Sequence, residues 1–183
     1  MLYILEADPD ITIIGTVRDG EEALVSPFTS GTAFPTGGAA VQPRVSIELA
    51  PEQYPDYFEL QQIPIVSQGF LDALASAGVD NFVAYPVTLQ ESARAVPGHS
   101  VLHIIGRVAA LDEGKSNVTR LGRQIMRMRR LALKSNITTD LPMFRLHELH
   151  YLILLAQRVR DAVAKLTGVV TSEAEGWSDS HQF

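Results

Sequence analysis

The chain has 183 residues, of which 46% are hydrophobic and 20% charged, and its formal net charge is −6. This composition excludes a disordered chain and is typical of one globular domain with a sizeable core. Cysteine is absent, which excludes a disulfide framework and thiol chemistry. The start does not resemble a secretion signal, and no apolar run has the length of a membrane span, so we expect a cytoplasmic protein.

The front section, residues 1–60, is acidic and rich in turn-forming residues. It carries ten acids and two bases, a net charge of −8. The segments 2–5 and 10–17 contain the branched apolar residues of short strands, and 26–40 has the glycines and prolines of a long loop. We expect an irregular section whose acids either face solvent or steer a basic partner toward the protein.

A clearer pattern begins after the front section. Residues 63–67 predict a short buried strand that ends in Ser67, a suitable cap for a helix over 68–77. Gly78 ends this helix, and 79–85 predicts a second strand. Together these segments form a strand–helix–strand unit.

The middle of the chain predicts two further strands. One lies within 100–112 and starts near Val101. The other is 125–134, where the spacing of methionines and leucines favours a strand over a helix. Residues 116–139 carry six bases and no acids, so this region has a net charge of +6.

The strand–helix–strand unit recurs near the end of the chain. Residues 152–155 predict a buried strand and 156–166 a helix that covers a sheet. Aligning 65–79 with 154–169 pairs identical residues: Gln68 with Gln157, Asp72 with Asp161, Ala73 with Ala162, Ala75 with Ala164, Gly78 with Gly168 and Val79 with Val169. We therefore predict a mixed α/β (α+β) fold: a single domain over 1–178, with the front section 1–60, a strand–helix core over 61–178 and a tail over 179–183.

Two motifs suggest ligands but do not match the patterns that bind them. His147 and His150 are three residues apart, whereas the zincin motif places its histidines four apart, and no third ligand is nearby. The segment "DEGKS" (112–116) ends like a phosphate-binding loop, but the glycine needed five positions before Gly114 is Ala109. We expect two turns here, and no metal or cofactor.

No catalytic motif is present either. There is no G-x-S-x-G sequence, and the paired acids Glu21 and Glu22 lie in a turn-like stretch where exposure is the simpler explanation. The basic residues of 120–134 lack interleaved aromatic side chains. Two alternatives stay open: a nucleic-acid-binding regulator that uses 120–134, and an enzyme whose site would be a closed, apolar-lined pocket with converging ionisable groups.

Several segments in a shared order resemble one family. They are "PDYFELQQIPIVSQGFLDALASAGVDNFVAYPVTL", "IIGRVAALDEGKS", "LPMFRL" and "LAQRVRDAVAKLTGVVTSEAEGW", which lie within roughly residues 55–178 and include Trp177. The order resembles that of an immunity-protein family of myxobacterial type, encoded beside bacterial polymorphic toxins and formerly known as a domain of unknown function.

The resemblance implies a non-enzymatic protein that binds and neutralises a cognate toxin by occluding its active site. The implied partner is the toxin, encoded by the adjacent gene, with no cofactor, membrane or nucleic acid; a nuclease is one toxin class that fits, because nucleases are basic. We expect Pro142, Phe144 and Leu146 to lie in the core, and Arg145 to form a buried ion pair or a surface contact. The predicted toxin-binding residues are the acids of the front section: Asp8, Asp10, Asp19, Glu21 and Glu22.

Overall fold

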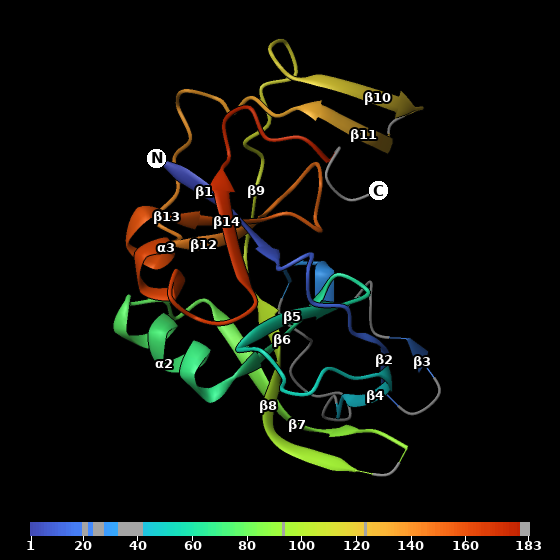
Figure 1. Cartoon of the computed structure of the whole chain (residues 1–183). Coiled ribbons are helices and arrows are strands. Elements are labelled where there is room, and N and C mark those ends of the chain that lie inside the picture. Colours follow the sequence, from blue (N-terminus) through green and yellow to red (C-terminus); the bar gives the residue numbers. More distant parts are fainter. Residues whose placement is uncertain (20–21, 24–27, 33–41, 93, 123, 180–183) are drawn as a thin grey trace.

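The computed structural model describes residues 1–19, 22–23, 28–32, 42–92, 94–122 and 124–179, the side chains of 22–23 excepted. Figure 1 shows two larger sheets, a hairpin at one end and two short helices along one side. With 47% strand and 12% helix, the predicted mixed α/β class is confirmed in its coarse form, although strands dominate. None of the helices in the described ranges is long and apolar enough to cross a membrane.

The larger sheet contains seven strands: β2 (Ile14–Asp19), β3 (Glu22–Ala23), β4 (Arg44–Leu49), β5 (Tyr57–Leu60), β6 (Ile63–Ser67), β7 (Phe82–Gln90) and β8 (Ala95–Ile104). Their order is β3-β2-β4-β7-β8-β6-β5. Neighbours are antiparallel except β4 and β7, which are parallel, so the sheet is mixed.

The smaller sheet has five strands: β1 (Leu2–Ala7), β9 (Arg107–Val108), β12 (Met143–Leu146), β13 (Ile153–Ala156) and β14 (Val169–Glu173). Their order is β14-β1-β13-β12-β9, with only β9 and β12 parallel. The hairpin is formed by β10 (Asn117–Leu121) and β11 (Gln124–Arg130). The strand predicted for 125–134 is therefore confirmed over 125–130, and the helix alternative is excluded.

The repeat predicted from the sequence is present in the structure. Helix α2 (Gln68–Ser76) follows β6, and helix α3 (Gln157–Val163) follows β13. In each helix the glutamine donates from Nε2 to the aspartate four residues later, Gln68 to Asp72 and Gln157 to Asp161, both at 2.8 Å. Each is then followed by a glycine in the left-handed region, Gly78 with φ +68° and Gly168 with φ +78°.

The repeat extends well beyond these segments. Each helix is preceded by a hairpin, β5–β6 or β12–β13, and followed by a strand, β7 or β14. Strand β8 pairs with both β6 and β7, and β1 pairs in the same way with both β13 and β14. We call β5, β6, α2, β7 and β8 unit A, and β12, β13, α3, β14 and β1 unit B. The first strand of the chain thus completes unit B in the position that β8 occupies in unit A.

The strand registers show which residues of the two units are equivalent. Since Phe58 pairs with Ile65 and Phe144 with Leu154, the next residues, Glu59 and Arg145, occupy equivalent positions. The same comparison makes Glu6 of β1 equivalent to His103 of β8. Each unit therefore places an ionisable side chain at both of these positions. Unit A has Glu59 and His103, and unit B has Arg145 and Glu6.

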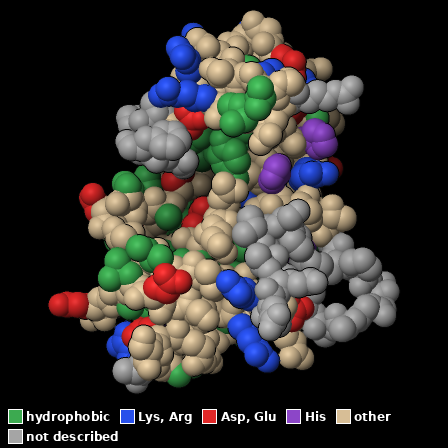
Figure 2. Space-filling view, turned by 90° about the vertical axis from the view of Figure 1, so that its right-hand side faces the viewer, with side chains coloured by type: hydrophobic (Ala, Val, Ile, Leu, Met, Phe, Trp, Pro, Cys, Tyr) green, Lys and Arg blue, Asp and Glu red, His purple; other side chains and the backbone are tan. Residues whose placement is uncertain are grey.

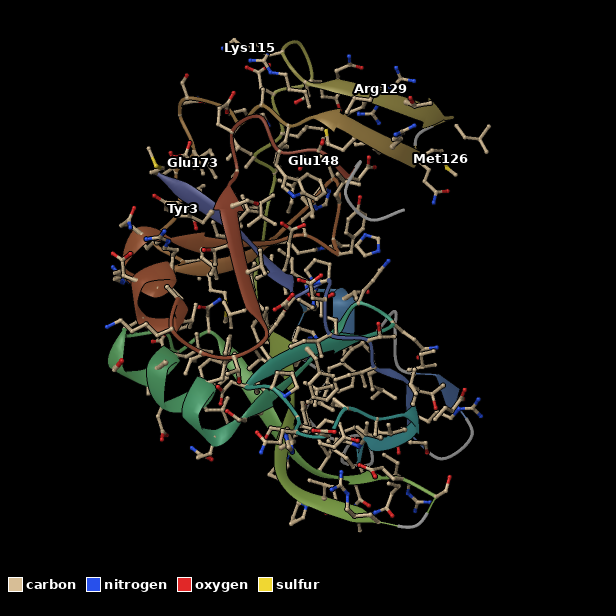
Figure 3. All side chains as sticks on the ribbon, viewed as in Figure 1. Tyr3, Lys115, Met126, Arg129, Glu148 and Glu173 are labelled. Atoms are coloured by element: carbon tan, nitrogen blue, oxygen red, sulfur yellow. The ribbon has the colours of Figure 1, made fainter. Side chains whose placement is uncertain are left out.

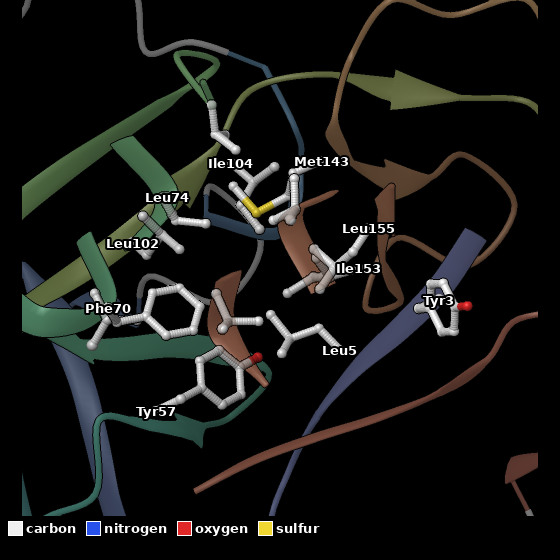
Figure 4. Packing of buried hydrophobic residues seen from close by; sticks show 14 residues of the cluster. Tyr3, Leu5, Tyr57, Phe70, Leu74, Leu102, Ile104, Met143, Ile153 and Leu155 are labelled. Carbon is white, nitrogen blue, oxygen red and sulfur yellow. The ribbon is translucent and has the colours of Figure 1, made fainter. Parts of the chain in front are cut away.

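One hydrophobic cluster joins the two units. Figure 4 shows Tyr57, Phe70 and Leu102 of unit A packed with Leu5 and Ile153 of unit B. A second cluster lies between the smaller sheet and the β10–β11 hairpin, and a third lies on the larger sheet. The predicted core residues Pro142, Phe144 and Leu146 are all buried. Because both units contribute to the first cluster, separating them would expose its apolar residues to water.

Asp56 and Gly168 connect the two units. The Asp56 carboxylate accepts hydrogen bonds from Ser67 Oγ at 2.6 Å and from the Thr167 nitrogen and hydroxyl at 3.0 and 2.8 Å. Burial alone would raise the pKa of Asp56, but the hydrogen bonds from Ser67 and Thr167 outweigh burial and hold the pKa below its usual value. A β-carbon at Gly168 would overlap the Tyr57 carbonyl oxygen and lie 2.6 Å from Cβ of Pro55. Only glycine permits this approach.

Two predicted boundaries differ from the structure. Strand β7 does not stop before Pro86 but continues to Gln90. Pro86 pairs with Ser100 of β8, and strand β4 pairs with β7 only at Leu89 and Gln90. On the β4 side no neighbouring strand therefore requires the N–H that proline lacks. Strand β8 begins at Ala95, six residues before Val101, to pair with this longer β7. The turns predicted for 112–116 and for 147–150 are present.

The front section is more regular than predicted. It supplies β1 to the smaller sheet and β2, β3, β4 and β5 to the larger one. Of the expected loop 26–40, only 28–32 is described, and there Phe28 is fully buried against Tyr85 and His103. At the other end, Asp179 is not part of a tail: it is buried, and its Oδ2 accepts a hydrogen bond from the Met128 nitrogen at 2.7 Å.

Candidate functional site

An open pocket of about 810 Å³ lies where unit B faces the β5–β6 hairpin. In Figure 2 the surface is hollowed at mid-height, with apolar and acidic side chains around the hollow. The pocket is lined by residues from β1, β14, the β5–β6 hairpin, the loop before β13 and the segment 175–178: Leu5, Glu6, Ala7, Pro9, Glu59, Gln62, Tyr151, Leu152, Val170, Ser172, Glu173, Glu175, Gly176, Trp177 and Ser178. It therefore collects side chains that are far apart in the sequence.

The walls of the pocket are apolar and acidic. Leu5, Val170 and Trp177 supply apolar and aromatic surface, and four glutamates supply the charge. None of the described lining residues is a lysine, arginine or histidine. Figure 3 shows one of these acids, Glu173, at the end of β14, where it is exposed. Since acids gathered in a shallow, partly apolar site reinforce one another, the pocket attracts cations.

Glu6 is held in place within this wall. Its Oε1 accepts a hydrogen bond from Trp177 Nε1, and its Oε2 accepts one from Ser172 Oγ, both at 3.1 Å. Strand β1 thus orders both the carboxylate and the indole next to it. Trp177 is the only tryptophan of the chain and is almost fully buried.

Glu59 is the most strongly desolvated acid of the pocket. Burial raises its pKa above the usual value, although the hydrogen bond that Tyr57 Oη donates to Oε1 and the nearby charge of Arg145 oppose this, and Glu6 adds to it. Burial and the same glutamate also raise the pKa of Tyr57. A negative charge on Glu59 is therefore costly unless a cation comes close to it.

Arg145 lies fully buried behind the pocket. Its Nη1 donates to the His150 carbonyl oxygen at 2.7 Å, and Nε and Nη2 have no hydrogen-bond partner among the described residues. Burial lowers its pKa, and Tyr57 and Glu59 partly restore it. The expected surface contact is excluded, and no carboxylate in the described ranges comes within 4.0 Å of the guanidinium to form an ion pair.

The turn between β5 and β6 has an unusual backbone. Gln61 and Gln62 have φ of +54° and +67°, a backbone conformation that residues other than glycine and asparagine rarely adopt. A two-residue hairpin turn with positive φ at both positions matches the twist of the flanking strands. This turn places Gln62 on the pocket wall next to Glu59.

The structure brings together only some of the predicted toxin-binding acids. Asp8 and Asp10 share the turn after β1, where Asp8 Oδ1 accepts a hydrogen bond from the Asp10 nitrogen at 3.0 Å and the intervening Pro9 lines the pocket. Asp19 ends β2 in the other large sheet. Glu21 and the side chain of Glu22 lie outside the described residues. Two of the five predicted acids therefore flank the pocket.

The histidine pair lies on the loop between β12 and β13. His147 and His150 are both exposed. Partial desolvation of the His150 ring, followed by the charges of Arg145 and Arg107, lowers the pKa of His150. Within the described ranges, no group of three histidine, aspartate or glutamate side chains is placed to hold a metal ion.

The basic segment 120–134 forms the protruding β10–β11 hairpin and the residues after it. Figure 3 shows Met126 and Arg129 on the hairpin, and both are exposed. Two of its arginines have acidic partners: Arg120 pairs with Glu113 at 2.9 Å and Arg127 with Asp179 at 3.7 Å. The described partners come from the neighbouring turn and the C-terminal segment, not from the acidic front section.

The pocket also bears on the enzyme alternative. It is open rather than closed, but it does gather ionisable groups around an apolar wall. Its acid of raised pKa, Glu59, could exchange a proton, whereas both oxygens of Glu6 already accept hydrogen bonds. The Ser172 hydroxyl of the wall donates its proton to the Glu6 carboxylate, which also accepts a hydrogen bond from Trp177 Nε1. The pocket therefore has only some of the features expected of an enzyme site: it gathers ionisable groups beside an apolar wall, but it is open.

Sequence reasoning missed the glutamates of the pocket. Glu59 interrupts the buried residues of β5, and Glu6 follows three buried residues in β1, so a charged residue in a short apolar strand was the available signal. Glu173 and Glu175 lie within the last part of the family-like segment, which ends at Trp177.

Comparison with known proteins assigns no family: no family model matches the chain, and no curated protein matches it.

Proposed function

We propose that the protein is an immunity protein, which binds a cognate bacterial toxin in the cytoplasm of the producing cell and blocks its active site. The order of motifs described above supports the family, and the acidic pocket supports a basic partner. The single observation that carries the proposal is this pocket: four glutamates, apolar and aromatic walls, and no base among its described lining residues.

The scaffold fits such a role. Two units share one hydrophobic cluster, and Asp56 and Gly168 tie them together, so the surface around the pocket is preorganised. Preorganisation lowers the entropy lost on association and favours slow dissociation, which a neutralising protein needs. A basic nuclease is one partner class whose substrate-binding cleft an acidic surface would fill.

The test is capture of the partner from the native bacterium with the tagged full-length protein, followed by mass spectrometry. We expect one stoichiometric protein, encoded by the adjacent gene, that arrests growth when expressed alone and does not when co-expressed with this chain. Recovery of a partner whose toxicity persists on co-expression would contradict the proposal.

The exposed basic hairpin favours a second candidate, a nucleic-acid-binding regulator. A two-stranded ribbon with arginines fits a major groove, although Arg120 and Arg127 already have acidic partners. Duplex binding that weakens steeply with salt, and that substitution of Arg129 and Arg130 by alanine abolishes, would favour this candidate. Salt-insensitive or undetectable binding would remove it.

A further inference from the structure

We propose that the pocket accepts the guanidinium or ammonium group of a basic loop of the protein partner, with the cation placed between Glu59 and Glu6. This inference rests on the proposed function and defines the chemistry by which the same site recognises its partner. The occupant is a loop tip rather than a single side chain, because a volume of about 810 Å³ exceeds what one arginine fills.

Glu59 gives the pocket an electrostatic preference for a cation. Its carboxylate is desolvated and has Glu6 nearby, and among the described residues the Tyr57 hydroxyl and the charge of Arg145 are what compensate. A cation that enters the pocket would stabilise the ionised form of Glu59 and reduce the mutual repulsion of the glutamates. Charge complementarity therefore favours a basic occupant.

The walls fit the rest of a long basic side chain. Val170 can cover its methylene groups, and the half-buried Tyr151 offers aromatic surface to its charge. Trp177 donates its N–H to Glu6, so the indole is already fixed and loses little entropy on binding. The positive-φ turn holds Gln62 at the rim as an additional hydrogen-bonding group.

The comparison of the two units gives a further reason. At the position of unit B that corresponds to Glu59, the chain itself supplies a guanidinium, that of Arg145. Arg145 is enclosed by the protein, whereas Glu59 faces the open pocket. The fold thus already holds one cation near Glu59 from the inside, and leaves room for another from the outside.

The direct test uses the fluorescence of Trp177, the only tryptophan, as the reporter. The full-length protein is titrated with a capped Gly-Gly-Arg-Gly-Gly peptide, and in parallel with the same peptide carrying citrulline, which has the shape of arginine without its charge. We expect a saturable change with the arginine peptide and binding weaker by about tenfold or more with citrulline. Equal binding of both peptides, no saturable change, or tighter binding of free spermidine than of the arginine peptide would overturn the inference.

Substitutions locate the effect. We expect Glu59→Gln to weaken binding of the arginine peptide by about tenfold. Glu48→Gln, on the exposed face of β4, should leave this affinity unchanged. If Glu59→Gln does not fold, Glu173→Gln at the exposed rim takes its place, with a smaller loss expected. Equal affinities in the pocket variant and the control would contradict the proposed site.

The outcomes separate this inference from the proposed function. A captured toxin that is neutralised equally well by Glu59→Gln and the wild type would leave the immunity function standing and remove the pocket as its site. Selective binding of the arginine peptide without recovery of any toxin would leave the pocket standing as a site for basic groups and remove the immunity function.

Discussion

Units A and B share one strand order but differ in how they are stabilised. Unit A is continuous in the chain, has Ser67 as the N-cap of α2, and ends its helix at Gly78 with open space around it. Unit B needs β1 from the other end of the chain, has the uncapped Ala156 before α3, and packs Gly168 against unit A. The difference teaches that unit B depends on contacts with the rest of the molecule for its stability, and these contacts also form the pocket.

Equivalent charged positions differ in the same way. Arg145 of unit B is enclosed, whereas Glu59 of unit A opens onto solvent through the pocket. A duplicated scaffold can thus conserve backbone and packing while it changes the charge at matched positions. We expect stability to follow the shared features and binding to follow the features that differ.

The largest expected effect compares the two helix-ending glycines. Gly78→Ala should cost about 1 kcal/mol of unfolding free energy, because only the left-handed backbone is strained. Gly168→Ala should cost about 3 kcal/mol, because its β-carbon also meets the backbone of Tyr57. Urea unfolding of both variants measures the difference, and equal losses would contradict the contact between the units.

Removing the Asp56 carboxylate should have the next largest effect. Asp56→Ala should lower the unfolding free energy by about 2 kcal/mol, since Ser67 and Thr167 lose a charged acceptor. Because the folded-state pKa of Asp56 lies below its usual value of 3.8, its stabilisation is present above pH 3.8 and lost as the pH falls through the lowered pKa. Unfolding curves at pH 7 and at acidic pH should therefore differ less in Asp56→Ala than in the wild type.

The caps of the two helices offer a reciprocal exchange. Ser67→Ala should destabilise by about 1 kcal/mol, since Ser67 Oγ accepts a hydrogen bond from the Phe70 nitrogen at 3.2 Å. Ala156→Ser should stabilise by up to about 1 kcal/mol, because Ala156 has the extended φ of −68° and ψ of 156° found at N-caps. Thermal unfolding with both variants checks the signs, and a loss of stability in Ala156→Ser would show that α3 tolerates no cap there.

The smallest effect concerns the coupling between the equivalent charges. Arg145→Met removes a charge that lowers the pKa of Glu59, so that pKa should rise further in the variant, as carbon NMR of the carboxyl group would show. With a folded-state pKa above its usual value of 4.5, Glu59 contributes stability at lower pH that is lost as the pH rises through the folded pKa. Glu59→Gln should remove this part of the pH dependence, and an unchanged pH profile would argue against the burial of this carboxyl.

The local elements of both units could be predicted because short-range chemistry determines them. The strand 63–67, its Ser67 cap and the glycine after each helix follow from hydrophobic pattern, cap preference and backbone freedom. The pairing of β1 with β13 and β14 could not be predicted, since partners more than a hundred residues apart leave no local signal. The pocket depends on that pairing, so its glutamates were not recognised as a group.

The net charge of the front section did not identify which acids share a surface. Of the predicted acids, Asp8 and Asp10 flank the pocket, while Asp19 belongs to the other large sheet. Charge summed along a chain does not reveal which acids share a surface. The topology of the sheets decides that.

The most direct test of the account is the affinity of the captured partner for the double variant Glu173→Lys/Glu175→Lys, measured by calorimetry against Glu48→Lys as the control. Glu173, Glu175 and Glu48 are all exposed, so each variant should fold, although the double variant loses the hydrogen bond that the Leu133 nitrogen donates to Glu175 Oε2 at 3.1 Å. Only the double variant reverses charge at the pocket. We predict a loss of at least about a hundredfold for the double variant and no change for the control. Equal affinities for the two variants would contradict the assignment of the pocket as the binding site.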